Sequence, residues 1–333
     1  MRDLRWLRAG AGLALLAALL PFFAQAQAYK YIRVGNAADV PVKPRAGFAL
    51  MGGGEDLDEA FRFLCDRAHG GDFLVLRSHG DDDYNPFIAK LCTLNSVATI
   101  IIPSRAAAAD PTVAEKIAHA SAIFIAGGDQ GEYIRFWKGT PVNDALNDAI
   151  RRGVPMGGTS AGLAVLGQFI YTSLGDKPDE PNLDGRTAMA DPFGPRIALD
   201  HGFLDISLLR GVITDTHFAT RSRMGRLLTF LARLNYDGNA VRGIGVEQRA
   251  AVLLNPDGSA TVVGHGAAYF VDPAGASGTV MQGKPLTYGP YAVQKTAAGH
   301  AFNVKTWSGD ATRYTLSVAN GAIRSTQAGG AVY

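Results

Sequence analysis

The segment GGTSAGL, residues 157–163, constrains the fold of this chain more than any other feature. The residues before it, from Arg151 to Met156, indicate a helix end, a turn and a short buried strand. The residues after it, from Ala161 to Phe169, predict an apolar helix. A strand that enters a helix this directly needs small residues at the turn and a strained backbone at its tip. The segment therefore predicts an α/β fold that exposes Ser160 at the carboxyl edge of a sheet.

Ser160 has two interpretations at this stage. As a nucleophile, it would attack a carbonyl group while the N–H of Ala161, at the start of the helix, stabilises the resulting oxyanion. As an ordinary residue of a glycine-rich turn, it would only cap the helix. The local pattern alone does not separate the two, so partners must be sought elsewhere in the chain.

Two other predicted strands end in residues suited to acyl transfer. The run Val212–Phe218 places His217 just past a strand, and the run Gly243–Glu247 ends in a carboxylate. A Ser nucleophile needs a neutral imidazole to accept its proton and a carboxylate to orient that imidazole. Because the carboxyl ends of parallel strands share one sheet edge, Ser160, His217 and Glu247 are predicted to meet there.

A second glycine turn is expected beside this group. The predicted strand Ser121–Ala126 runs into Gly127 and Gly128, and a helix follows from Gln130 to Trp137. The N–H of Gly128 would be a second oxyanion donor, next to that of Ala161.

Four blocks together resemble the cyanophycinases and cyanophycinase-like serine peptidases in order and spacing. The blocks are GGDQ at 127–130, GTSAG at 158–162, DTHF at 215–218 with three Arg residues after it, and GVE at 245–247. This family is related to the aspartyl dipeptidases and to the class I glutamine amidotransferase fold. The resemblance spans roughly Ala46 to Asp272. It implies a mostly parallel sheet flanked by helices, with Ser160 as nucleophile, His217 as base and Glu247 as the orienting acid.

The resemblance also implies a substrate pocket, formed by Gln130, Asp215, Arg221, Arg223 and Arg226. The family usually has Gln where this chain has Thr216, which affects side-chain specificity rather than hydrolysis. We expect a peptide or polymer substrate with β-aspartyl linkages, and favour a cyanophycin-like polymer of β-aspartyl-arginine. In this hypothesis the Arg residues bind a carboxylate and Asp215 a cationic side chain. The alternative is that the Arg residues only pair with surface carboxylates.

Three other functions remain open from the sequence. The first is an isoaspartyl or aspartyl dipeptidase. The second is an esterase, which is disfavoured because α/β-hydrolases place the acid between the nucleophile and the His. An esterase would need Asp176, Asp179 or Asp191 as its acid. The third is a non-catalytic peptide-binding protein of the same fold, which would not need all three of Ser160, His217 and Glu247.

The N-terminal residues 1–28 have the pattern of a signal peptide. Arg2, Arg5 and Arg8 precede an apolar run from Ala9 to Phe23, and small residues follow at 24, 26 and 28. A membrane anchor is the weaker alternative because the apolar run is short for a spanning helix. We therefore expect export to the periplasm or beyond, with no membrane association after cleavage.

Composition excludes some partners and cofactors. The 333 residues are 47% hydrophobic and 19% charged with a net charge of +2, and no basic run argues for nucleic acid. The run Gly52–Gly54 lacks the spacing of a dinucleotide site and predicts a tight turn beside the active site. The polar loop at 78–85, with His79 and three Asp residues, could be a metal site. We favour a rim loop in contact with cationic substrate, and expect no metal and no cofactor.

The remaining features concern organisation. Residues 29–45 predict an extended lead-in, 46–272 the peptidase domain and 273–333 a β-rich appendage. The appendage could bind polymer or a second subunit, so a homodimer stays open, but we expect it mainly to pack against the core. Cys65 and Cys92 could form a disulfide in an exported chain or remain two buried thiols.

Overall fold

The structure is a computed structural model that describes residues 28–177, 180 and 182–333. The predicted signal peptide, apart from Ala28, lies outside the described residues, as does Asp179, one of the alternative acids.

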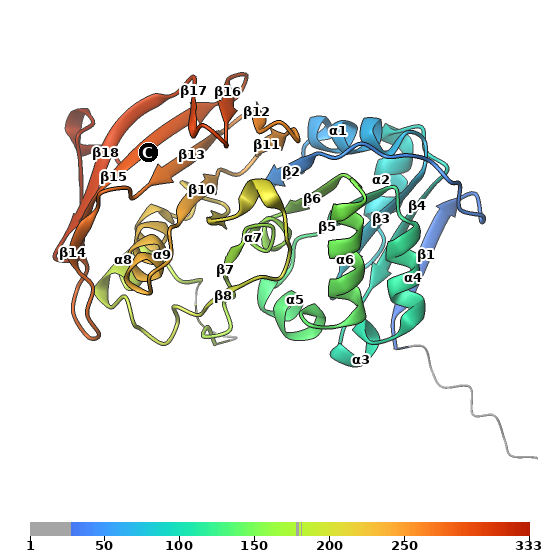
Figure 1. The fold of residues 1–333 in the computed structure, drawn as a ribbon, viewed down its shortest axis with the longest axis horizontal. Helices are drawn as coiled ribbons and strands as arrows, with labels where there is room; N and C mark the ends of the chain where they lie inside the picture. The colour runs from blue at the N-terminus through green and yellow to red at the C-terminus, as the bar shows by residue number, and fades with distance from the viewer. Residues whose placement is uncertain (1–27, 178–179, 181) are drawn as a thin grey trace, which may run out of the picture.

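A mixed ten-stranded sheet forms one half of the molecule (Figure 1). In order across the sheet its strands are β1 (Lys30–Gly35), β4 (Ser96–Ile101), β3 (Asp72–Arg77), β5 (Ala122–Ile125), β6 (Met156–Thr159), β2 (Phe48–Met51), β11 (Ala250–Leu254), β12 (Ser259–Gly264), β16 (Ala301–Asn303) and β17 (Ser308–Gly309). The five strands from β4 to β2 are parallel, and every other pairing in this sheet is antiparallel.

Helices cover both faces of this sheet. They are α1 (Asp58–Ala68) and α2 (Tyr84–Leu91) on one face, and α3 (Arg105–Ala108), α4 (Pro111–His119), α5 (Gln130–Trp137) and α6 (Pro141–Arg151) on the other. Strand residues alternate between the faces. Ile123 and Ile125 of β5 pack with Trp137 of α5, whereas Phe124 between them packs with Phe61 of α1. Both faces of the parallel strands are therefore buried, as the apolar runs in the sequence predict.

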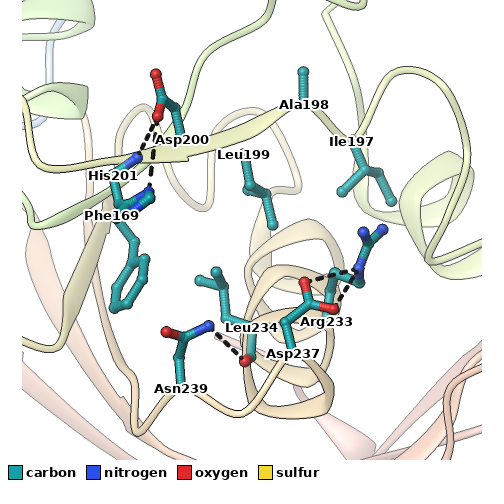
Figure 2. A pocket seen from close by; sticks show the side chains of 10 residues that line it. All are labelled: Phe169, Ile197, Ala198, Leu199, Asp200, His201, Arg233, Leu234, Asp237 and Asn239. Carbon is teal, nitrogen blue, oxygen red and sulfur yellow. Dashed lines mark hydrogen bonds and ion pairs between the residues drawn. The ribbon is translucent and has the colours of Figure 1, made fainter.

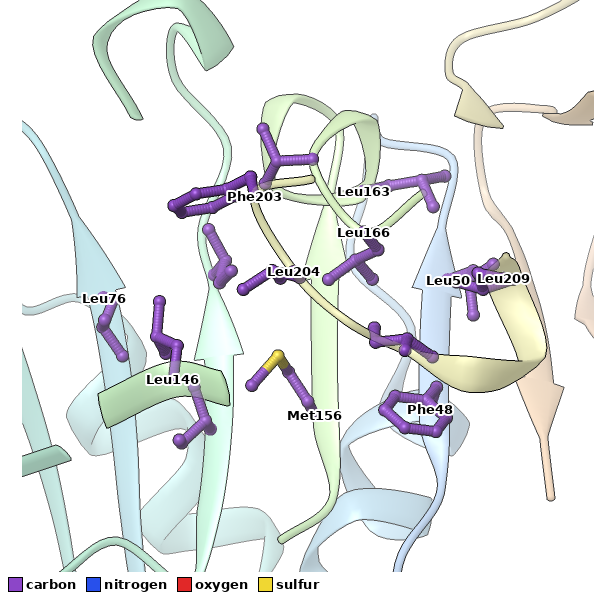
Figure 3. Close-up of a cluster of buried hydrophobic side chains, with 14 of the residues drawn as sticks. Phe48, Leu50, Leu76, Leu146, Met156, Leu163, Leu166, Phe203, Leu204 and Leu209 are labelled. Atoms are coloured by element: carbon purple, nitrogen blue, oxygen red, sulfur yellow. The ribbon is translucent and has the colours of Figure 1, made fainter. Parts of the chain in front are cut away.

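Figure 3 shows part of the first of these clusters. Leu50 of β2, Met156 of β6, Leu146 of α6 and Leu163 belong to this cluster, and each is fully buried. Burying a side chain of this size contributes about 1.5–3 kcal/mol to stability relative to leaving it in water. The strand β6, which leads to Ser160, is therefore fixed by its pairing with β2 and β5 and by the helices packed on its face.

A second sheet forms the other half (Figure 1). Its strands in order are β19 (Ala322–Ser325), β18 (Thr312–Ala319), β15 (Thr287–Ala297), β13 (Ala267–Asp272), β10 (Arg242–Val246), β9 (Val212–Asp215), β7 (Phe169–Tyr171) and β8 (Leu199–His201), with β14 (Ser277–Thr279) paired to β15. Only β10, β9 and β7 are parallel neighbours. The helices α8 (Gly185–Ala190) and α9 (Met224–Tyr236) pack against it.

The α/β class predicted from the sequence is confirmed, but two expectations need correction. Both sheets are mixed, because parallel pairing covers only the strands from β4 to β2 in the first sheet and β10, β9 and β7 in the second. The β-rich residues after Asp272 exist but form no separate appendage. The strand β15 pairs with β13, and β16 pairs with β12, so these residues extend both sheets of the core.

Shorter segments also differ from expectation. The predicted helix from Ala161 to Phe169 ends early: α7 spans Ala161–Ala164, and Phe169 begins β7. The extended lead-in contains β1, which pairs with β4. Cys65 on α1 and Cys92, just after α2, form a disulfide, which decides between the two alternatives left open by the sequence.

Candidate active site

Ser160 lies at a sharp turn between β6 and α7. Its backbone has φ 52° and ψ −115°, and its N–H donates to the carbonyl of Met51 at 3.1 Å. The small neighbours are needed for this turn. A Cβ on Gly162 would lie 1.9 Å from the carbonyl oxygen of Ile125, and one on Gly158 would lie 2.5 Å from the backbone of Gly162. A non-glycine residue with positive φ at such a turn is a strained conformation of the kind found at functional sites.

His217 follows β9 and contacts Ser160 directly. Its backbone also has positive φ, 46°, and its N–H donates to the carbonyl of Gly52 at 2.8 Å. The imidazole Nε2 lies 2.7 Å from Ser160 Oγ, within hydrogen-bond distance. The structure thus brings together the predicted nucleophile and the predicted base, each at the carboxyl end of a parallel strand.

The glycine turn after β2 lies against this pair. A Cβ on Gly53, which has φ +97°, would be 2.5 Å from Cε1 and Nε2 of His217 and 3.1 Å from Cβ of Ser160. Only glycine therefore leaves room for the imidazole at its observed position. The sequence prediction of a tight turn beside the active site agrees with this placement.

The predicted contact between Glu247 and the imidazole is wrong. The Glu247 carboxylate accepts hydrogen bonds from the N–H groups of Ala219, Thr220 and Gln248 and from the Thr220 hydroxyl. The side chain that reaches His217 Nδ1 is that of Gln248, whose amide nitrogen Nε2 lies 2.8 Å away. Sequence reasoning missed Gln248 because it looked for a carboxylate. Glu247 is the carboxylate directly after β10, but the side chain of the next residue, Gln248, is the one that reaches the imidazole.

The surroundings of His217 favour its neutral form. Burial is the largest cause, followed by the nearby charges of Arg221 and Arg223, and together they lower the pKa of His217 to about 4. Asp215 acts in the opposite direction but is outweighed. At neutral pH the imidazole can therefore accept a proton from the Ser160 hydroxyl.

The proposed pocket residues divide into paired and available groups. Asp215 and Arg226 form a buried bidentate ion pair, and Arg226 also donates to the Leu183 carbonyl. Arg223 is buried and donates to the carbonyl and hydroxyl of Thr216. Asp215 therefore does not serve as a free binding group for a cationic side chain, and the predictions for Asp215 and Arg226 are corrected to a structural ion pair.

Arg221 differs from the other two Arg residues. It is exposed, and within the described part of the chain its guanidinium makes no hydrogen bond or ion pair. Of the three, Arg221 has the side chain best placed to bind a substrate carboxylate.

The remaining predicted residues lie around Ser160. A Cβ on Gly127 would be 3.7 Å from Ser160 Cβ, so the turn that contains Gly128 is beside the nucleophile. Ala161 is the first residue of α7, where an N–H has no acceptor within the helix. Gln130 is half-buried at the first position of α5, directly after this turn. These positions are compatible with oxyanion and substrate contacts, which stay predictions.

An acidic hollow is lined in part by the residues that directly follow the glycine turn. It has a volume of about 540 Å³ and is lined by Glu55, Asp56, Asp58, Arg77, Asp81, Asp83, Tyr84 and Phe87. Tyr84 donates to Asp56 at 2.6 Å, and burial raises the pKa of the Asp56 carboxyl. Glu55 and Asp56 directly follow Gly52–Gly54 in the chain. The predicted rim loop at 78–85 therefore contributes to a negatively charged hollow beside the site.

Another hollow, of about 400 Å³, lies between β8 and the end of α9 (Figure 2). Arg233 and Asp237 form an ion pair across one side of it, and His201 and Asn239 lie on the other. It contains none of the predicted site residues. Among residues 28–177, 180 and 182–333, no three His, Cys, Asp or Glu side chains converge in a way that could hold a metal ion. No helix in that part of the chain is long and apolar enough to span a bilayer.

The fold and the Ser160–His217 pair are of the kind found in serine-type peptidases. The chain belongs to peptidase family S51, whose family model matches residues 88–261. The family and fold predicted from the four sequence blocks are thus confirmed.

Individual relatives agree with this assignment. The chain is similar to a cyanophycinase of Synechococcus elongatus, with 26% identity over 220 residues that cover 64% of this chain and 62% of that protein. A cyanophycinase of Trichormus variabilis is 30% identical over 178 residues, 50% of this chain and 51% of that one. The alignments therefore span less than two thirds of these relatives. The crystal structure of a peptidase from an acI-B1 Actinobacterium shares the fold, with a TM-score of 0.51, 17% identity, and coverage of 78% of this chain and 98% of that chain.

Proposed function

We propose that this chain is an exported serine peptidase that hydrolyses amide bonds of β-aspartyl peptides, with a cyanophycin-like β-aspartyl-arginine polymer as the favoured substrate. The observation that carries the proposal is the 2.7 Å contact between Ser160 Oγ and His217 Nε2 at a strained strand-to-helix turn. The relatives named cyanophycinase support the choice of substrate class.

The proposed reaction has two steps. His217 Nε2 takes the hydroxyl proton as Ser160 Oγ attacks the carbonyl carbon, and the N–H groups of Ala161 and Gly128 stabilise the oxyanion. The tetrahedral intermediate then breaks its C–N bond, and the imidazolium returns the proton to the leaving amine. A water molecule repeats the sequence on the acyl-enzyme, which releases the acid and restores Ser160.

Substrate recognition in this proposal uses charges on both sides of the reacting pair. Arg221 is the group proposed to bind the free carboxylate of a β-aspartyl unit. The carboxylates that line the acidic hollow, among them Asp81 and Asp83, are proposed to attract the arginine side chain of the substrate. This replaces the earlier hypothesis for Asp215, whose charge is neutralised by Arg226.

The test compares wild-type protein with Ser160→Ala on cyanophycin, β-aspartyl-arginine and α-aspartyl-arginine. We expect wild type to prefer the β-linked substrates and the variant to lose about a million-fold in turnover with an unchanged circular dichroism spectrum. Labelling of Ser160 by a fluorophosphonate with no peptide hydrolysis would favour the esterase alternative. No labelling of folded wild type would favour a non-catalytic peptide-binding protein, and cleavage of short β-aspartyl dipeptides alone would favour the dipeptidase.

Export is the second part of the proposal. It is supported by the basic, apolar and small residues at 1–28 and by the Cys65–Cys92 disulfide, since disulfides persist mainly in oxidising compartments. Mass spectrometry of protein recovered outside the cytoplasm should find a chain that starts after Ala26 or Ala28. An intact N-terminus on that protein would contradict export by signal cleavage.

A further inference from the structure

The second ring nitrogen of His217 is held by an amide rather than by a carboxylate. Nε2 faces Ser160 Oγ at 2.7 Å, and Nδ1 faces the amide nitrogen Nε2 of Gln248 at 2.8 Å, while the amide oxygen of Gln248 lies toward Gly54. A neutral imidazole has one N–H and one lone pair, so the partner of Nδ1 decides which nitrogen can act as a base. This inference rests on the proposed acyl transfer at Ser160.

The two ends of the amide have opposite effects on the ring. If the amide oxygen faces Nδ1, it accepts Nδ1–H, and Nε2 keeps the lone pair that takes the Ser160 proton. If the NH₂ group faces Nδ1, it donates to that nitrogen, and Nε2–H then donates to Ser160 and cannot accept its proton. The second orientation is the one in this structure, and the first differs from it only by a rotation of the amide about its last torsion, which keeps the same volume.

The backbone around Gln248 fixes where the amide lies. A Cβ on Gly54 would lie 3.3 Å from Cβ and 3.5 Å from Oε1 of Gln248, so the side chain packs over the glycine turn. The carbonyl of Gly53 accepts from Arg249 at 3.0 Å, which ties the segment after β10 to the same turn. The turn that leaves room for the imidazole therefore also supports the residue that orients it.

Glu247 does not compete for the imidazole. Its carboxylate accepts hydrogen bonds from four donor groups, three of them in residues 219–220, just after His217. Glu247 thus holds the backbone beside the base, and the ring itself has an uncharged partner.

We propose that Gln248 is the positioning residue of this site: rotated by half a turn about its last torsion, its amide presents the oxygen to Nδ1–H of His217 and holds the imidazole as the tautomer whose Nε2 takes the proton from Ser160, without a negative charge beside the ring. In a Ser-His-Asp site the carboxylate both orients the imidazole and stabilises its charged form. An amide supplies orientation alone, as the Asn of papain-like proteases does.

The charges that face His217 make this difference measurable. Arg221, Arg223 and Arg226 come from the start of α9 and the loop before it, and Asp215 comes from β9. Glu247 ends the neighbouring strand β10, and Glu55 and Asp56 follow the glycine turn. The cationic groups and burial hold the base in its neutral form. A carboxylate placed at position 248 would oppose them and raise the pH at which the base becomes protonated.

The experiment uses the full-length protein with Gln248→Glu and Gln248→Leu, and with Gln282→Glu and Gln282→Leu as matched controls. Gln282 is exposed in the loop between β14 and β15. Acylation by a small activated ester is followed from pH 3 to pH 9, about the range that brackets both protonation states of the base. Nitrogen NMR of His217 reports its tautomer and its titration independently of activity.

We expect wild type to have its proton on Nδ1. Gln248→Leu should lower acylation at neutral pH by about 10²–10⁴-fold with little change in the Michaelis constant, as loss of the orienting partner does in Ser proteases. Gln248→Glu should keep the tautomer and raise the acidic midpoint by about 1–3 pH units, the effect of an opposite charge at this distance. The Gln282 variants should match wild type.

Three results would overturn the proposal: wild-type acylation in Gln248→Leu, an unshifted midpoint in Gln248→Glu, or a wild-type proton on Nε2. If Gln248→Leu fails to fold by circular dichroism, the Gln248→Glu shift and the wild-type tautomer decide the matter. If wild type does not react with the ester, the proposed function fails, whereas the NMR titration of His217 still tests the contact with Gln248.

Discussion

Gly53 determines whether the imidazole can occupy its position. Gly53→Ala would place a methyl group 2.5 Å from the ring of His217, so the ring must move away from Ser160. We expect turnover to fall by about 100-fold, since a displacement of about 1 Å costs that much at a reacting centre. Steady-state kinetics on a small ester, with thermal unfolding in parallel, measures both effects.

Gly70→Ala is the matched control for this change. Gly70 also has positive φ, +75°, but no atom lies within 4 Å of its added Cβ. Both variants should lose about 1–2 kcal/mol of stability from backbone strain, and only Gly53→Ala should lose activity. Equal turnover in the two variants would mean that the glycine turn does not limit the position of the base.

Substitutions of Arg221 and Arg226 should have different effects, one on substrate binding and the other on the stability of the fold. Arg226→Ala leaves the buried Asp215 carboxylate without its bidentate partner, so the free energy of unfolding should fall by about 3–5 kcal/mol. Arg221→Ala should change stability by less than about 0.5 kcal/mol, because the residue is exposed. Its Michaelis constant for β-aspartyl-arginine should rise about 10–100-fold, while hydrolysis of an ester without a carboxylate stays unchanged. A Michaelis constant that is unchanged for both substrates would make Arg221 a surface residue without a role in binding.

The sequence predicted the reacting pair but not its surroundings. Ser160 and His217 stand at strand ends, where an apolar run followed by a polar residue can be read from one segment. Which charges pair cannot be read in this way. Asp215 meets Arg226 only because α9 packs against β9, and Gln248 rather than Glu247 reaches the ring only because of how the chain leaves β10. These contacts depend on tertiary packing.

At the scale of elements, long patterned segments were predicted well. The helix Gln130–Trp137 has the predicted bounds, and the predicted strand Ser121–Ala126 is one residue too long at each end, because the apolar run ends at clear turn residues. The helix after Ser160 was too long in the prediction. An apolar stretch such as 161–169 fits a buried helix or a buried strand equally well, and here it contains a short helix followed by β7.

The disulfide between α1 and the end of α2 closes a loop across β3. Its cysteines are 27 residues apart, and loop closure of this length stabilises a fold by about 3–4 kcal/mol in the chain-entropy model. We expect Cys92→Ser to lower the free energy of unfolding by about 2–4 kcal/mol in denaturant titrations. Reductant should destabilise wild type to the same extent and should leave Cys92→Ser unaffected. A wild-type curve that reductant does not move would contradict a stabilising role.

At the scale of the whole molecule, the C-terminal strands are part of the core. Six residues of β15 pair with β13, from Ala267 with Ala297 to Asp272 with Ala292. Phe302 of β16 stacks on Phe270 with ring centroids 3.6 Å apart, which joins this region to the other sheet as well. Composition changes after Asp272, but the hydrogen bonds do not stop there. A boundary drawn from composition therefore cuts through a continuous sheet.

This continuity predicts that residues 1–272 do not fold without the rest. Removal of residues 273–333 would leave β13 with an unpaired edge. It would also expose the apolar residues that now pack against β15 and β18, including those in the cluster of Leu316. We expect the truncated chain to be insoluble, or soluble without a cooperative unfolding transition. In the full chain, Leu316→Ala should cost about 2–5 kcal/mol, whereas Ser317→Ala, at the next position of β18, should cost less than about 0.5 kcal/mol. A truncated protein that unfolds cooperatively and hydrolyses the ester would show that the C-terminal strands are an independent appendage after all.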